Sequence, residues 1–290
     1  MKLHSLACHS AVEMALRGFA SLARCSDQPL HFVVHDDGSL TADDSSRLRA
    51  MLDEVTIVER RAADAAVEER LSRHPLCRRF RQGNPLALKL LDIPLLADGD
   101  VAICDTDLFA FAPFAGLFEF PAADVDGVFM PDTQNAYSMR PWHLVASGIA
   151  LPSHVNTGLM LFRRSRYDLD FIEWFLARQF NVYRRLPGWL EQTCWAALAH
   201  RGRCLLYEAA QVRVIRGESC LDDGELLIGH FTADIRGLWG RTEPRSSSTH
   251  ITRVRTTPAT ALSPARLAAE QIGRAARRGR GWLSQVALQR

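Results

Sequence analysis

The amino-acid sequence predicts an α/β fold: a Rossmann-like, mixed but mainly parallel sheet with helices on both faces. Two observations lead to this prediction. Over the first 60 residues, apolar and β-branched runs alternate with segments of helical periodicity, and a β-α-β-α-β order is typical of a parallel sheet covered by helices. Hydrophobic residues make up 47% of the 290 residues, which is enough for a packed core.

The first half of the chain contains the clearest elements. Residues 36–38 (Asp-Asp-Gly) mark a turn after the second strand. Thr41 and Asp44 resemble a capping box, which predicts that a helix begins there. The predicted strands are residues 3–8, 30–35, 55–59 and 101–104, and the predicted helices are residues 11–23, 41–54, 60–82 and 85–96.

The second half continues this alternation and then becomes polar. After Trp239, serines and Thr-Thr-Pro indicate a linker, and a last helix is expected at residues 264–278. We therefore divide the chain into an α/β domain, residues 1–240, and a basic linker with a C-terminal helical tail, residues 241–290. The other predicted elements are strands at residues 127–130, 158–162, 204–208, 212–215 and 226–231, the last three closing the sheet, and helices at residues 168–180 and 189–200.

The net charge of +2 is unevenly distributed. Residues 241–290 carry ten arginines against two glutamates, so this tail has a net charge of +8 and the first 240 residues have −6. The acidic body and the scarcity of aromatic residues in the tail argue against a nucleic-acid partner. The tail is either a solvated segment or one that lies on an anionic membrane through its arginines and interspersed apolar residues, among them Ile272 and Trp282.

The seven cysteines are scattered, odd in number and without a C-x-x-C pair, which predicts buried thiols in a reducing compartment and neither a disulfide scaffold nor a zinc site. The start of the chain has no apolar stretch long enough for a signal peptide, and no apolar run approaches the length of a transmembrane helix. We expect a cytoplasmic protein, with peripheral contact to the inner membrane face if the tail binds lipid.

The sharpest chemical signal is a D-x-D motif. The apolar strand at residues 101–104 ends in Asp105-Thr106-Asp107. Ligands bind at the carboxyl ends of strands in open α/β sheets, and alternate residues of an extended chain point to one side. Two close carboxylates repel unless a positive charge lies between them, and Mg²⁺ or Mn²⁺ bridging to a diphosphate would supply it. The alternative is a solvated turn, where aspartate is common.

Two neighbouring motifs support a phosphate or sugar site. Lys89 lies on an apolar helix that leads into the D-x-D strand, where it either extends to solvent or points at a phosphate. Asn156-Thr157-Gly158 is read as a polar turn into the strand at residues 158–162. Asn156 either satisfies local backbone or binds sugar hydroxyls.

The order and spacing of these motifs resemble the GT-A glycosyltransferases, above all the group of glycogenin and the bacterial lipooligosaccharide galactosyltransferases. The shared features are a K-L-x-D helix, the D-x-D, an N-T-G segment, an acidic-Gln pair and a late His-Phe. The opening is also similar to that of uncharacterised bacterial glycosyltransferases, in A-C-H-S at residues 7–10 and V-H-D-D-G-S-L-T at residues 34–41. The resemblance extends from about residue 3 to 240 and implies a GT-A fold.

The resemblance implies a metal site. Asp105 and Asp107 would hold Mn²⁺ or Mg²⁺ against the diphosphate of a sugar nucleotide, and His230 would be the third ligand. An imidazole ligand favours Mn²⁺. His230 is alternatively a core histidine at a strand end. Arg236 stands near the place of a diphosphate-binding lysine in the family's Lys-Pro-Trp, a departure that weakens this correspondence.

The remaining site residues follow from the same resemblance. Glu191 and Gln192 match an Asp-Gln pair near the reactive carbon of the sugar, and with Lys89 they form the expected catalytic set. Glu191 is alternatively an ordinary acid in the first turn of a helix. The expected donor-binding set is Ala7, Cys8, His9, Asp36, Lys89, Asp105, Thr106, Asp107, Asn156, Thr157, Gly158 and Arg236.

The predicted function is metal-dependent transfer of a sugar from a nucleoside diphosphate sugar, UDP- before GDP-, to an acceptor hydroxyl, with retention if the group resemblance holds. The acceptor is a glycan, a lipid-linked sugar or a protein, and its site is expected in residues 132–150, with Tyr137 and Trp142, and residues 180–189, with Tyr183 and Trp189. One alternative is a non-catalytic or degenerate sugar-nucleotide-binding domain. A D-x-D phosphatase is a weaker alternative, because its motif lies on the first strand.

Overall fold

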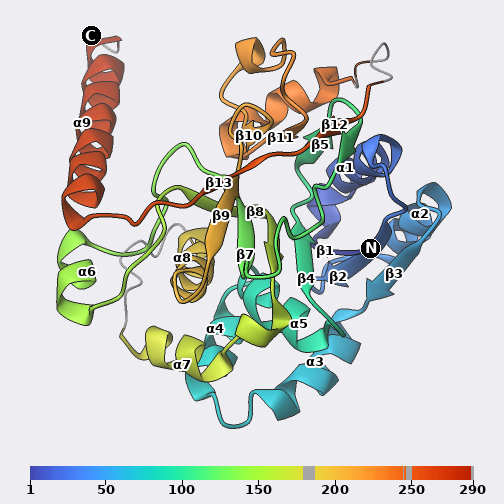
Figure 1. Cartoon of the computed structure of the whole chain (residues 1–290), viewed down its shortest axis with the longest axis horizontal. Helices are drawn as coiled ribbons and strands as arrows, with labels where there is room; N and C mark the ends of the chain where they lie inside the picture. The colour runs from blue at the N-terminus through green and yellow to red at the C-terminus, as the bar shows by residue number, and fades with distance from the viewer. Residues whose placement is uncertain (179–186, 244, 246–249, 289–290) are drawn as a thin grey trace.

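An eight-stranded sheet forms the centre of the computed structural model, which describes residues 1–178, 187–243, 245 and 250–288 (Figure 1). The strand order is β13-β9-β7-β8-β4-β1-β2-β3. β8 and β13 run antiparallel to the other six strands, which confirms the predicted mixed, mainly parallel sheet. The strands are β1 (Lys2–Ala7), β2 (His31–Asp36), β3 (Val55–Val58), β4 (Val101–Cys104), β7 (Gly127–Pro131), β8 (Val155–Phe162), β9 (Cys204–Tyr207) and β13 (Thr256–Pro258).

Helices cover both faces of this sheet, as predicted. In β4, Ala102 and Cys104 belong to the core beneath α1 and α2, whereas Val101 and Ile103 belong to the core beneath the other helices. This alternation follows from the two-residue period of a strand. The helices on the first face are α1 (Val12–Cys25) and α2 (Ala42–Met51), and those on the second face are α3 (Arg60–Arg70), α4 (Pro75–Gly83), α5 (Ala87–Leu96), α7 (Leu169–Ala177) and α8 (Pro187–Ala199).

A second, three-stranded sheet corrects one prediction. The sequence predicts that strands at residues 212–215 and 226–231 close the main sheet, and this is wrong. Instead, β10 (Val212–Val214) pairs with β11 (Ile228–His230), and β11 pairs with β5 (Leu108–Ala110), which directly follows the D-x-D motif. Three-residue strands are too short to show a periodic pattern, so only the long-range pairing defines this sheet.

Several boundaries also differ from the predictions. The helix expected at residues 60–82 is two helices, because Pro75 begins α4 and disfavours a helical backbone at His74. β8 begins at Val155, so Asn156-Thr157-Gly158 lies inside a strand and is not a turn. The predicted capping box of α2 is present. Of the helix predicted at residues 168–180, α7 ends at Ala177, and residues 179 and 180 lie outside the described residues.

The segment after residue 241 contains two short strands as well as the predicted last helix. β12 (Thr252–Arg253) pairs with β6 (Phe114–Ala115), and β13 adds the edge strand beside β9. α9 (Pro264–Leu288) then begins next to α6 (Pro141–Ser147), and its later part stands clear of the body in Figure 1. The short 3-10 turns are η1 (His9–Ala11), η2 (Arg164–Arg166), η3 (Glu218–Cys220) and η4 (Ala233–Arg241). Among the helices of the described part of the chain, none has the length and apolar composition that crossing a bilayer requires.

Candidate active site

The sheet brings the predicted site residues from several strands to one edge. Because β1 pairs in parallel with β2, Ala7 lies opposite Asp36 at the ends of these strands. β1 also pairs in parallel with β4, with His4 opposite Ile103, so Asp105 follows at the same edge. This is the carboxyl edge, where ligands bind in α/β sheets.

Asp105, Asp107 and His230 form the centre of the candidate site. One potential ligand atom from each residue lies within 4.8 Å of the others. His230 Nε2 is 2.9 Å from Asp107 Oδ1 and 3.7 Å from Asp105 Oδ2. The pairing of β11 with β5 brings His230 here, because His230 lies opposite Leu108. Thr106 lies between the two aspartates and is nearly buried. Two carboxylates and an imidazole are ligands that suit Mn²⁺ or Mg²⁺, so these residues fit a divalent cation.

Mutual pairing sets the charge state of this cluster. Burial alone raises the pKa of Asp107, but His230 and Arg236 outweigh burial and hold this pKa well below its ordinary value. Burial alone lowers the pKa of His230, but Asp107 outweighs burial, so the pKa lies above its ordinary value. Asp107 is therefore ionised at neutral pH, which is the state that a cation requires.

Lys89 lies next to Asp105, and its side chain is 5% exposed. Its ammonium group donates a hydrogen bond of 2.6 Å to Asp105 Oδ1. Burial alone lowers the pKa of Lys89, but Asp105 and Glu191 more than compensate, so the pKa lies above its ordinary value. Lys89 stays charged and engages Oδ1 of Asp105, while Oδ2 is the oxygen nearest His230.

Arg236 reaches the other aspartate from η4. Its Nη2 and Nε donate to Asp107 Oδ2 over 2.8 Å and 3.3 Å. The Arg236 side chain is 54% exposed, in contrast to the buried Lys89. The structure therefore brings Arg236 to the D-x-D motif itself, a contact that the sequence does not predict.

Gly158 makes room for His230. The carbonyl of Gly158 accepts a hydrogen bond of 2.7 Å from the backbone N–H of Asp105. A Cβ atom on Gly158 would lie 2.4 Å from His230 Cε1 and 2.6 Å from His230 Nδ1, which is closer than real Cβ contacts. Only glycine therefore allows β8 and the imidazole to approach this closely.

Glu191 is buried on α8, which packs against α5 and β8. Thr157 Oγ1 donates a hydrogen bond of 3.1 Å to Glu191 Oε2, and Glu191 Oε1 has no hydrogen-bond partner among the described residues. Burial raises the pKa of Glu191 to about 7, even though the charge of Lys89 opposes this shift. A buried carboxyl group with one unengaged oxygen and a pKa near neutrality is typical of a functional position.

Asn156 and Gln192 contact the loop that follows β7. Asn156 Nδ2 donates to Asp132 Oδ2 over 3.0 Å, and Asn156 Oδ1 accepts from the N–H of Gly158 over 2.8 Å. Gln192 Nε2 donates to the carbonyl of Ala136 over 3.2 Å. Both side chains therefore hold the start of the predicted acceptor loop in this structure.

The side chains that follow β1 and β2 are engaged in turns and in a contact with the start of α2. Asp36 Oδ1 accepts hydrogen bonds of 2.8 Å and 3.0 Å from two backbone N–H groups. His9 Nδ1 lies 2.7 Å from Asp44 Oδ2, and Cys8 Sγ lies 3.3 Å from Ser10 Oγ. These residues lie at the carboxyl edge of the sheet, and in this structure their polar atoms bind the following turns or the start of α2.

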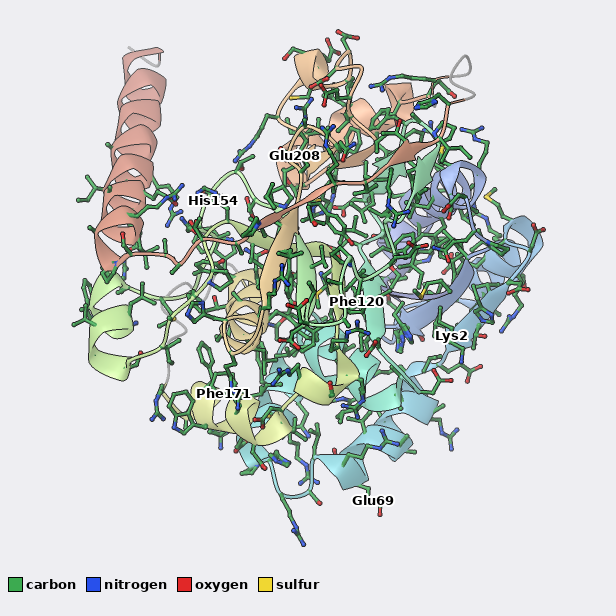
Figure 2. All side chains as sticks on the ribbon, in the orientation of Figure 1. Lys2, Glu69, Phe120, His154, Phe171 and Glu208 are labelled. Carbon is green, nitrogen blue, oxygen red and sulfur yellow. The ribbon has the colours of Figure 1, made fainter. Side chains whose placement is uncertain are left out.

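α9 contacts the predicted acceptor loop, a contact that the sequence does not predict. Glu270 accepts hydrogen bonds of 2.9 Å and 2.7 Å from the backbone and side-chain nitrogens of Asn135. His154 lies beside the first turns of α9 (Figure 2), where its Nε2 is 2.9 Å from Arg266 Nη2. No local pattern could have revealed these contacts, because more than a hundred residues separate the partners.

The aromatic residues of the predicted acceptor site differ in exposure. Tyr137 is fully buried and its hydroxyl donates to a backbone carbonyl, so it is a core residue. Trp142 is 62% exposed on α6. The Arg274 guanidinium lies 5.1 Å from the ring centre of Trp189. Tyr183 lies outside the described residues.

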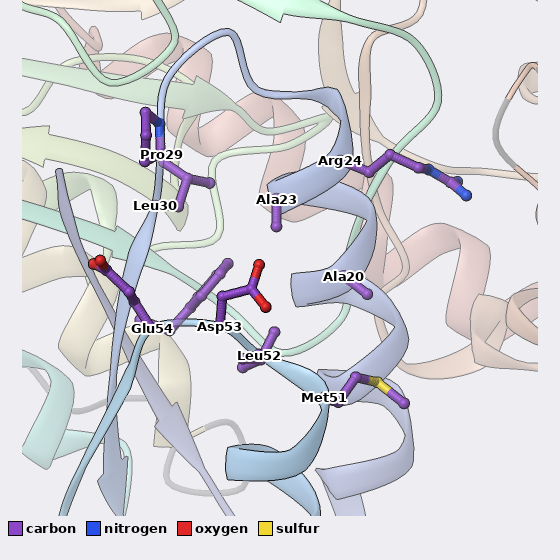
Figure 3. A pocket seen from close by; sticks show the side chains of 10 residues that line it. Ala20, Ala23, Arg24, Pro29, Leu30, Met51, Leu52, Asp53 and Glu54 are labelled. Carbon is purple, nitrogen blue, oxygen red and sulfur yellow. The ribbon is translucent and has the colours of Figure 1, made fainter.

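Two cavities lie away from the metal-ligand cluster. A cavity of about 530 Å³ (Figure 3) is lined by Ala23, Leu30 and Asp53, among others, near the beginnings of β2 and β3 at the opposite edge of the sheet. A second cavity of about 500 Å³ lies beside the ends of β2 and β3, with Asp36 and Arg60 in its lining.

Comparison with solved structures shows that this chain has a GT-A glycosyltransferase fold, as the sequence predicts. No family model matches the sequence, and no curated protein matches it either. Solved structures do match. One is the galactosyltransferase LgtC in complex with donor and acceptor sugar analogues, at 14% identity over 85% of this chain and 98% of LgtC, with a TM-score of 0.54.

Two further solved structures show the same likeness. Mouse xyloside xylosyltransferase 1 is 13% identical over 81% of this chain and 99% of its own, with a TM-score of 0.50. GlyE of Streptococcus pneumoniae is 11% identical over 83% of this chain, with a TM-score of 0.52, and the match spans 59% of the GlyE chain. At these identities the likeness shows a shared fold.

Proposed function

We propose that this chain is a metal-dependent glycosyltransferase that moves a sugar from a nucleoside diphosphate sugar to an acceptor hydroxyl. The observation that carries the proposal is the cluster of Asp105, Asp107 and His230 at the carboxyl edge of a GT-A sheet. Fold alone does not define a reaction, but a cation site at this edge of this fold suits a diphosphate ligand.

The proposed chemistry relies on positive charge next to the leaving diphosphate. A divalent cation held by Asp105, Asp107 and His230, Mn²⁺ rather than Mg²⁺ because of the imidazole, would stabilise the charge that grows on this leaving group. Lys89 fixes one of these carboxylates through its buried ion pair. Arg236 is close enough to the cluster for its guanidinium to bind two phosphate oxygens in a bidentate manner.

Glu191 and Gln192 are proposed to face the reacting sugar. The support is that Glu191 is buried beside Thr157 and interacts with Lys89 and Asp105, and keeps one oxygen without a protein partner among the described residues. The resemblance to the glycogenin and lipooligosaccharide galactosyltransferase group favours UDP over GDP and retention of anomeric configuration. Ala7, Cys8, His9 and Asp36 are proposed to border the base and ribose.

The acceptor is proposed to bind beside the loop after β7, which α8 and α9 hold from two sides. It would be a glycan, a lipid-linked sugar or a protein with a free hydroxyl. The seven cysteines, all free in the structure, support the cytoplasm as the location. The arginines of the distal α9 are proposed to contact the inner membrane face.

The first test is calorimetric titration of UDP, GDP, CDP and ADP into the protein, each with and without Mn²⁺, followed by turnover of the matching radiolabelled sugar nucleotide. We expect one nucleotide, UDP, to bind only when Mn²⁺ is present. Absence of binding by all four nucleotides to folded protein would refute the proposal. Mn²⁺-dependent binding without transfer or hydrolysis would instead indicate a degenerate binding domain.

Asp107→Asn should abolish the Mn²⁺ dependence of nucleotide binding and lower turnover by about 100-fold or more, because it removes a charged ligand from the cation. Asp98→Asn is the matched control, since Asp98 is an exposed partner of Lys2 far from the cluster. Unchanged turnover in Asp107→Asn would exclude this cation site.

A further inference from the structure

We infer that Arg236 is an exchangeable partner of Asp107: it neutralises this carboxylate until a cation binds, and then moves to the diphosphate of the incoming nucleotide. The inference rests on the proposed function and adds an order of events to it. Its basis is a difference between the two aspartates in how their oxygens are engaged.

Asp107 has both carboxylate oxygens engaged. His230 Nε2 lies 2.9 Å from Oδ1, while Arg236 contacts Oδ2 through Nη2 at 2.8 Å and Nε at 3.3 Å. Asp105 is different, because Lys89 engages Oδ1 at 2.6 Å and Oδ2 has only the more distant His230 at 3.7 Å. A cation can therefore use Asp105 without displacing Lys89, but at Asp107 it meets an oxygen that already has a partner.

The two basic partners also differ in how easily they can leave. Lys89 is 5% exposed, and an ammonium group at that depth is strongly destabilised when it loses its counter-charge. Arg236 is 54% exposed and can be solvated as soon as it separates from Asp107. Asp107 itself is buried, with 6% of its side chain exposed, so it needs a counter-charge; a divalent cation supplies one as it replaces the guanidinium, which water then solvates.

Displacement would leave the guanidinium where a phosphate group needs it. Arg236 is anchored in η4, only a few residues after His230, so its side chain stays beside the cluster. A guanidinium presents paired donors that match two phosphate oxygens, and a cation-bound diphosphate is the nearest such anion. Arg236 thus weakens the binding of a cation alone and strengthens the binding of the nucleotide once the cation is bound.

This dual role predicts opposite effects of one substitution. In Arg236→Gln, the dissociation constant for Mn²⁺ alone should fall about two- to fivefold, because the cation no longer competes with the guanidinium for Oδ2 of Asp107. The dissociation constant for UDP at saturating Mn²⁺ should rise about 10- to 100-fold, because charge-assisted hydrogen bonds to the diphosphate are lost.

Calorimetry with Mn²⁺ alone, and then with UDP at saturating Mn²⁺, tests this on the full chain. Arg236→Lys should restore the wild-type affinity for Mn²⁺ but only part of the affinity for UDP, since lysine keeps the charge and loses the planar fork. Arg255→Gln is the control, because Arg255 is a similarly exposed partner of a glutamate away from the cluster.

The outcomes separate the inference from the proposed function. Tighter Mn²⁺ binding together with weaker UDP binding in Arg236→Gln supports exchange. Weaker binding of both ligands, or no change in Mn²⁺ affinity, overturns it and leaves the glycosyltransferase proposal intact. Failure of the wild-type protein to bind Mn²⁺ and UDP would overturn the proposed function, and the inference with it.

Discussion

Gly158 and His230 show how one residue's missing side chain positions the ring of another. Gly158→Ala should displace the imidazole, because the new methyl would lie 2.4 Å from His230 Cε1. We expect Mn²⁺ affinity to fall about tenfold or more and the free energy of unfolding to fall by about 1–3 kcal/mol, as for other overpacked sites.

Gly99→Ala is the matched control for this glycine, because a Cβ atom there would meet nothing within 4 Å. Metal titration and urea unfolding of both variants measure the two effects. Equal behaviour of the two variants would show that the approach of Gly158 to His230 has no role in the site.

At the same scale, the sequence predicts which residues gather but not how they pair. Asp105 and Asp107 are predictable because an apolar run delivers them to a strand end, and a strand end has a defined place in an α/β sheet. The pairing of Lys89 with Asp105 and of Arg236 with Asp107 is not predictable. Ion pairs depend on which elements pack together, and sequence spacing does not encode that packing.

β1 and β2 are joined by a buried histidine pair that makes the stability of the sheet depend on pH. His4 Nδ1 lies 3.0 Å from His35 Nε2. Burial lowers the pKa of His4 from 6.5 to about 4, and burial with the charge of His4 lowers the pKa of His35 from 6.5 to about 3. In the folded protein both rings are therefore neutral at mildly acidic pH.

The sign of the effect follows from proton linkage. Between pH 6.5 and about 4, the unfolded chain binds protons at both histidines and the folded chain does not, so stability is lost as pH falls. With both rings contributing, the free energy of unfolding should fall by about 2–3 kcal/mol per pH unit in the lower part of this window. Urea unfolding at pH 7.5, 6.0 and 5.0 measures this slope.

Replacement of both histidines by leucine should flatten the slope, whereas His200→Gln, at an exposed position, should leave it unchanged. The double variant is needed because the raised pKa of His230 stabilises the folded protein as pH falls, which opposes the effect of His4 and His35. An identical slope in the wild-type protein and the double variant would contradict the prediction.

Elements with strong local signals are the ones that the sequence predicts well. The capping box at Thr41 and the periodic apolar face of α1 are local signals, and both elements form as expected. β5 and β11 are three residues long and lie more than a hundred residues apart in the sequence. They form strands only because the fold pairs them with each other. The candidate site depends on that pairing, so its third candidate metal ligand, His230, is predictable from the resemblance and not from a local pattern.

At the scale of the whole molecule, the first part of the basic tail belongs to the fold, and only α9 extends beyond it. β13 completes the edge of the main sheet, so a deletion of residues 241–290 would remove a strand together with α9. Truncation after Ala276 is the better test, because it keeps the contact of Glu270 with the predicted acceptor loop and removes Arg277, Arg278, Arg280 and Arg290.

We expect the full chain to co-sediment with vesicles that contain phosphatidylglycerol at low salt. The affinity of the truncated chain should be about 100-fold lower or more, because each of the four arginines that are removed adds about 1 kcal/mol near an anionic surface and about 1.4 kcal/mol is a tenfold change in affinity. The melting temperature should not change. Equal binding of both chains would exclude the tail as the anchor, and no binding of either would identify it as a solvated segment.

Every residue of β4 is fully buried between two layers of helices, and this determines how fast the backbone amides around the site exchange their protons. Amide protons in the most enclosed strands exchange with deuterium only when the whole molecule opens, whereas exposed turns exchange through local opening. The backbone leading into Asp105 should thus keep its protons longest, and η4, which bears Arg236, should lose them early. Asp105 and Asp107, which follow β4, would then be held in fixed positions, while Arg236 on the exposed η4 would be able to move.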